Sequence, residues 1–105
     1  EPTTETLATL RLARVEASRG DVQGALQMIQ GIDPDGMRSA YEEAKGDFYV
    51  QMGDLESAYT AYQAAILSDQ SQDSRTAAIL RLKLSQATPA IAQDTGIEEQ
   101  LGESE

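Results

Sequence analysis

Residues 46–65 read GDFYVQMGDLESAYTAYQAA, and residues 13–32, which lie 33 positions earlier, read ARVEASRGDVQGALQMIQGI. Both stretches carry a small residue first, Gly-Asp at the eighth and ninth positions, and Ala at the thirteenth. A repeat of this length is typical of stacked helical hairpins, in which each hairpin covers the apolar flank of its neighbour. We therefore expect an all-α fold built from two such hairpins.

The residues at the hairpin turns indicate where helices end and begin. Gly20 and Gly53 suit the left-handed conformation that terminates a helix, and Asp21 and Asp54 can cap the helix that follows. A polar run then separates the second hairpin from an apolar segment, which we interpret as a single helix that closes the stack. The expected units are repeats over about 4–34 and 37–69 and a capping helix over about 73–88.

The connection between the hairpins contains the turn residues Asp33–Gly36. Ser39 and Glu42 have the spacing of a capping box, which would start the third helix at this point. Met37 and Tyr41 extend the apolar pattern toward the turn and favour a start one turn earlier. The two signals leave the start of this helix open by about one turn.

Small side chains mark the expected contacts between helices. Ala13 and Gly46, on the first helix of each hairpin, should face Ala25 and Ala58 on the second. Bulky residues are expected to fill the space around these contacts, namely Leu12, Ile29, Tyr49 and Tyr62.

Composition argues against catalysis and in favour of a partner protein. The chain has no Cys, His or Trp, which removes thiolate and imidazole nucleophiles, the usual zinc ligands and the commonest general base. Adjacent acids such as Glu42 and Glu43 point to different sides of a helix and do not converge. The net charge of −10 is unfavourable for binding nucleic acid. We predict no enzyme activity, cofactor, metal, small-molecule substrate or nucleic-acid partner.

Negative charge is concentrated at the C-terminal end. No basic residue follows Lys83, whereas the last part of the chain carries acids at Asp94, Glu98, Glu99, Glu103 and Glu105. Ile91, Ile97 and Leu101 are too few apolar groups to offset the cost of ordering the backbone. Residues 89–105 are therefore expected to form a disordered acidic tail, with one short amphipathic helix on a partner as the alternative.

The hairpins resemble the tetratricopeptide repeat, which has a small residue at its eighth position, an aromatic at its eleventh, and fixed alanine and aromatic positions in its second helix. The second copy matches through Gly46, Tyr49, Gly53, Asp54, Ala58, Tyr62 and Ala65. The first copy is degenerate, with Ala13, Glu16 and Ile29 in place of Gly, an aromatic residue and Tyr. Tyr41 and Tyr59 lie outside the pattern, and we expect them to be the more exposed tyrosines.

A more specific resemblance covers Leu7 to about Leu84. The run LRLARV at 10–15, together with Gly46-Asp47, the Gly53-Asp54 turn and Ala58, is similar to the C-terminal part of the YfgM-like ancillary subunits of the bacterial SecYEG translocon. This resemblance implies a periplasmic domain held at the inner membrane by an N-terminal transmembrane helix that is absent from this sequence. It also implies the translocon and a membrane-anchored periplasmic chaperone as partners.

In tetratricopeptide stacks the first helices of the repeats line a concave groove, and the same arrangement here predicts a mixed apolar and charged surface. The groove residues that we predict are Leu10, Arg14, Ser18, Glu43, Asp47, Gln51, Leu80 and Lys83. Such a surface suits an extended or helical segment of a partner protein. Arg11 and Arg14 could instead pair with acids of the neighbouring helix, a surface interaction worth about 0–1 kcal/mol.

The sequence thus favours a noncatalytic protein-binding module, and a structural or assembly module is the alternative. At the first hairpin, apolar residues would lack a covering neighbour, namely Leu7, Leu10, Val22 and Leu26. An uncovered repeat end favours homodimers.

Overall fold

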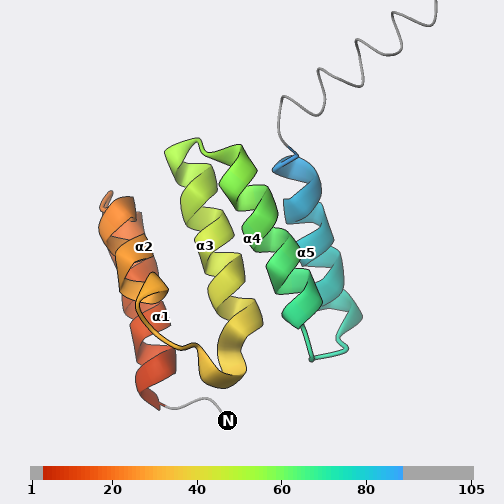
Figure 1. The fold of residues 1–105 in the computed structure, drawn as a ribbon, viewed down its shortest axis with the longest axis horizontal. Coiled ribbons are helices and arrows are strands. Elements are labelled where there is room, and N and C mark those ends of the chain that lie inside the picture. The colour runs from red at the N-terminus through yellow and green to blue at the C-terminus, as the bar shows by residue number, and fades with distance from the viewer. Residues whose placement is uncertain (1–3, 89–105) are drawn as a thin grey trace, which may run out of the picture.

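The computed structural model describes residues 4–88, which form a row of α-helices (Figure 1). In chain order these are α1 (Thr4–Ser18), α2 (Val22–Gln30), α3 (Arg38–Met52), α4 (Leu55–Ser68) and α5 (Ser74–Gln86). A 3₁₀ turn, η1 (Asp35–Met37), leads directly into α3. No strand occurs between residues 4 and 88, and the predicted all-α stack of helical hairpins is confirmed.

The two hairpin turns have the same construction. Gly20 and Gly53 both adopt positive φ, at 101° and 82°, where residues with a Cβ are strained. The Asp21 carboxylate accepts a hydrogen bond from the Gly24 N–H at 3.0 Å, and the Asp54 carboxylate accepts one from the Ser57 N–H at 3.2 Å. Each turn therefore ends one helix and caps the next within two residues, as predicted.

The start of α3 differs from the capping-box prediction. Pro34 begins the 3₁₀ turn, its carbonyl accepts the Met37 N–H at 2.8 Å, and the chain continues into α3 at Arg38. Ser39 consequently lies inside the helix, where its Oγ donates to the Ala65 carbonyl oxygen at 2.8 Å. The capping-box assignment was wrong because Pro34 starts helical structure upstream of Ser39, and the serine instead links α3 to α4.

Small residues lie at the closest helix contacts. Ala13, Ala25 and Ala58 have no exposed surface. A Cβ on Gly46 would overlap the Tyr62 ring, so Gly46 allows α4 to approach α3 through a tyrosine rather than through Ala58. Burial of such side chains is worth roughly 25 cal/mol per Å² of apolar surface, which is why the close approach matters for stability.

Of the residues expected to fill the space around these contacts, Ile29 and Tyr62 are buried and Tyr49 is half-buried, but Leu12 is 53% exposed. The buried row of α1 consists of Thr6, Leu10, Ala13 and Ala17. Leu12 lies on the opposite side of the helix from this row. The prediction for Leu12 was wrong because the first hairpin leaves that side of α1 uncovered.

The first hairpin covers its own apolar residues better than expected. Leu10 and Leu26 are each only 7% exposed, and Leu7 and Val22 are half-buried. The surface expected from these four residues is therefore largely absent. At the other end of the row, α5 lies within the predicted range 73–88, and the expected tail at 89–105 lies outside the described residues.

Candidate protein-binding surface

The first helices of the two hairpins and α5 are linked by a row of charged side chains. Arg14 of α1 contacts Asp47 of α3 at 3.1 Å, between Nη1 and Oδ2. Lys83 of α5 donates from Nζ to the same Oδ2 at 3.1 Å and to Glu43 Oε2 at 2.8 Å. Three helices are thus joined by alternating positive and negative groups, which we call the charged row.

Asp47 is the centre of the charged row. Its Oδ2 contacts both cations, and its Oδ1 accepts a hydrogen bond from the Tyr62 hydroxyl at 2.6 Å. Tyr62 belongs to α4 and reaches Asp47 past Gly46, which has no side chain to obstruct it. The second helix of the hairpin therefore orients the carboxylate that the first helix presents.

The environment of the charged row shifts two pKa values upward. For Lys83, burial alone would lower the pKa, but hydrogen bonds and charge interactions with Glu43 and Asp47 outweigh it, so the pKa is raised. For Tyr62, burial is the largest cause of a raised pKa, and the hydrogen bond to Asp47 adds to it. Lys83 stays charged and Tyr62 stays neutral near pH 7, which are the states that the geometry requires.

The other predicted groove residues divide between surface and core. Ser18 Oγ donates to the Val15 carbonyl oxygen at 2.7 Å, and Gln51 Nε2 donates to the Ala17 carbonyl oxygen at 3.0 Å. Gln51 thereby connects α3 to the end of α1. Leu10 and Leu80 are only 7% and 1% exposed.

Leu10 and Leu80 therefore cannot form the floor of a groove, contrary to the prediction. Both lie on the sides of their helices that pack against a neighbour, Leu10 in the core around α1–α3 and Leu80 on the α4 side of α5. A helical row of leucines does not distinguish a groove floor from a helix contact. The remaining six residues make up the surface that we consider below.

Two further assignments concern Arg11 and Tyr41. Arg11 is exposed and makes no ion pair within residues 4–88, so only Arg14 of the two arginines pairs with α3. Tyr41, expected to be exposed, is 1% exposed, and its hydroxyl donates to the Thr6 carbonyl oxygen at 2.6 Å. It was misjudged because Tyr41, Ala44 and Phe48 form one buried row of α3.

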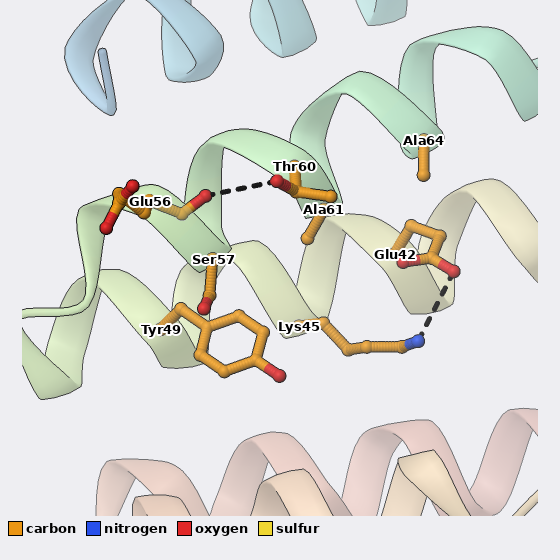
Figure 2. A pocket seen from close by; sticks show the side chains of 8 residues that line it. All are labelled: Glu42, Lys45, Tyr49, Glu56, Ser57, Thr60, Ala61 and Ala64. Carbon is orange, nitrogen blue, oxygen red and sulfur yellow. Dashed lines mark hydrogen bonds and ion pairs between the residues drawn. The ribbon is translucent and has the colours of Figure 1, made fainter. Parts of the chain in front are cut away.

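An open groove along α3 and α4 was not predicted (Figure 2). It has a volume of about 500 Å³ and is lined by Glu42, Lys45, Tyr49, Glu56, Ser57, Thr60, Ala61 and Ala64. Lys45 Nζ and Glu42 Oε2 pair within it at 3.3 Å. The helical spacing of small residues at Ser57, Ala61 and Ala64 is the sequence signal that could have indicated this groove.

A model of the tetratricopeptide repeat-like domain matches residues 1–88. The chain belongs to this family. Comparisons with curated proteins and with solved structures gave no match. Tetratricopeptide-like domains generally mediate interactions between proteins and are typically noncatalytic.

The chemistry of the described residues agrees with this family. Between residues 4 and 88 there is no cluster of three or more acidic, His or Cys side chains that could hold a metal ion. In the same range, no helix combines the length and the apolar character needed to cross a membrane. What this tetratricopeptide-like domain offers is a helical surface with fixed charges.

Proposed function

We propose that this domain is a noncatalytic protein-binding module whose binding surface is the charged row together with Ser18 and Gln51. The proposal is supported chiefly by the row itself, in which α1, α3 and α5 each contribute a charge held by a partner on another helix. Charges that are fixed before binding lose less conformational entropy when a partner is bound. The row would set the orientation and association rate of a partner that carries complementary charges.

Apolar contact at this surface is limited to a few residues. Val50 on α3 is 43% exposed, and Ala40 and Leu84 are half-buried. A partner would therefore gain from burying small apolar areas between charged positions, as an extended or helical protein segment does.

The resemblance to YfgM-like subunits supports a more specific proposal. In it, the domain lies on the periplasmic side of the bacterial inner membrane, anchored by a transmembrane helix outside this sequence. Its partners are the SecYEG translocon and a membrane-anchored periplasmic chaperone. The domain would act as an adaptor that brings the chaperone to the translocon.

The test uses two arginines of the same helix. Arg14→Glu removes the pair with Asp47, whereas Arg11→Glu makes the same charge change at an exposed position outside the row. With the periplasmic part of the chaperone titrated by calorimetry, we expect Arg14→Glu to weaken binding about tenfold, equivalent to 1.4 kcal/mol. Arg11→Glu should bind like the unchanged protein.

Equal affinities for the two variants, with circular dichroism showing both folded, would exclude the charged row as the binding surface. If neither the chaperone nor detergent-solubilised SecYEG binds the unchanged domain, the adaptor proposal fails. In that case a general screen for peptide ligands, compared between Arg14→Glu and Arg11→Glu, still tests the binding-module proposal.

Self-association is a second candidate function. Leu12 and Val15 are 53% and 43% exposed on the uncovered side of α1. Two exposed apolar residues at helical spacing favour contact with another helix. Light scattering across micromolar concentrations tests this, because a constant monomer mass excludes self-association.

A further inference from the structure

Helix α5 has apolar residues on two opposite sides. One side packs against α4, where Leu80 and Ala87 are 1% and 0% exposed. The other side, which we call the outer face of α5, carries Arg75, Ala78, Ile79, Leu82 and Gln86 at helical spacing. Ile79 and Leu82 are 45% and 58% exposed. A helix with two apolar sides is typical of a position between two neighbours.

The repeat itself indicates what belongs on this face. In the second hairpin, Gly46 is followed by Asp47, and α4 packs on Gly46 through Tyr62. In α5, Leu82 is followed by Lys83, which bonds to Asp47 in the charged row. Leu82 thus corresponds to Gly46, the position at which the second helix of a hairpin packs on the first. Within residues 4–88 no helix covers it.

The outer face of α5 also has a distinctive charge. Helix α5 contains three basic residues and no acid, although the whole chain has a net charge of −10. Of these residues, Arg75 and Arg81 are exposed and Lys83 belongs to the charged row. The 17 residues that follow Thr88 have the opposite composition, with five acids and no base. A basic apolar face and an acidic segment therefore adjoin in the sequence.

We propose that residues 89–105 bind the outer face of α5 as the second helix of a third hairpin. Thr88 and Pro89 are the residue types preferred at a helix N-cap and first turn. After a short turn, the remaining length equals about that of the 14-residue α4. Ile91, Ile97 and Leu101 would cover Ile79 and Leu82, and the acids would approach Arg75 and Arg81.

Direct attachment to α5 makes a weak contact sufficient. Linking two binding elements through a short connection gives an effective concentration in the millimolar range. Salt should weaken the contact, because exposed charges are screened at high ionic strength.

Paramagnetic relaxation provides the test, since the chain has no cysteine and one can be introduced without competition. A spin label on Ser104→Cys in the full chain should broaden amide signals near the start of α5, at Arg75–Ile79, because an antiparallel helix ends there. We expect at least half of the signal intensity to be lost at these residues and none in α1. Leu82→Glu should restore the signals, whereas Leu12→Glu, which alters a similarly exposed leucine on α1, should not.

Thermal melting supplies a second readout. Leu82→Glu should lower Tm in the full chain but not in a chain that ends at Thr88, whereas Leu12→Glu should act equally in both. No broadening at Arg75–Ile79, or an equal effect of Leu82→Glu in both chains, would overturn the proposal. Broadening that disappears when unlabelled protein is added in excess would also overturn it, because the contact would then lie between two copies of the chain.

Discussion

The two hairpins share a register of 33 residues but are held together differently. In the α3–α4 hairpin, Gly46 admits the Tyr62 ring, and the Tyr62 hydroxyl binds Asp47. At the equivalent positions the α1–α2 hairpin has Ala13 and Ile29, which are buried but provide no hydrogen bond. Apolar packing alone therefore maintains the repeat geometry, and the glycine–tyrosine pair adds a polar connection that orients a surface charge.

The largest expected effect concerns the glycine of this pair. In Gly46→Ala the new Cβ would overlap the Tyr62 ring, and overpacking costs about 1–3 kcal/mol. This loss should exceed the roughly 1 kcal/mol that alanine contributes to helix propensity. We expect a lower free energy of unfolding by urea denaturation. The control Gly31→Ala, whose Cβ would lie 3.8 Å from the nearest atom, should change it by less than about 0.5 kcal/mol.

A smaller effect is expected for the tyrosine hydroxyl. Tyr62→Phe removes the 2.6 Å hydrogen bond to Asp47, and we expect a loss of about 1 kcal/mol in the free energy of unfolding. Tyr49→Phe removes a hydroxyl that accepts a hydrogen bond from the exposed Gln30, and it should cost less. If the two variants unfold alike, the polar connection does not distinguish the second hairpin.

Alkaline pH should reveal the same connection. The pKa values of Tyr62 and Lys83 are both raised above their ordinary values of 10.0 and 10.5, so the folded protein favours their protonated forms. Their contribution to stability is complete below the unfolded-state pKa values and is lost as pH rises through the folded-state values. Tm measured from about pH 8 to 11 should fall more steeply for the unchanged protein than for Tyr62→Phe or Lys83→Met.

Lys45→Met serves as the control for the alkaline melt, because Lys45 lies outside the charged row and pairs with Glu42. It should retain the steep fall of the unchanged protein. A profile for Lys83→Met that matches the one for Lys45→Met would show that the charged row does not contribute to the pH dependence.

The smallest expected difference lies at the turns. Asp21 and Asp54 both cap a helix, but Asp54 also accepts a hydrogen bond from the Ser57 hydroxyl at 2.7 Å. Asp54→Ala should therefore lower Tm by a few degrees more than Asp21→Ala, and Ser57→Ala should remove most of the difference. Hydrogen bonds from Ser57 also lower the pKa of Asp54, so this contribution is present above pH 3.8 and lost as pH falls through the lowered pKa.

The fold could be predicted where a residue's backbone or spacing decides the outcome. Gly20 and Gly53 end helices because they adopt positive φ, and the aspartates that follow cap the next helices. These effects involve residues a few positions apart. The 33-residue period then fixes which helices pair, even though the first copy lacks the consensus glycine and tyrosine.

Prediction failed where the outcome depends on which side of a helix finds a neighbour. Leu12 and Tyr41 are both large and occur near helix contacts in the sequence, yet Leu12 is exposed and Tyr41 is buried. Leu10 and Leu80 were placed in the groove for the same reason. The open groove along α3 and α4 could not be anticipated from the motif, because it arises where small side chains leave space between helices.

The alternation of charge along the row has a consequence for how the units can be ordered. Arg14, Asp47 and Lys83 are contributed by successive helices, and each cation neighbours the central anion. A duplicated second hairpin placed after the original would bring two carboxylates together, and a duplicated first hairpin would bring together two guanidinium groups. The hairpins are therefore not interchangeable modules: their sequence along the chain is written in the sign of a single side chain per unit.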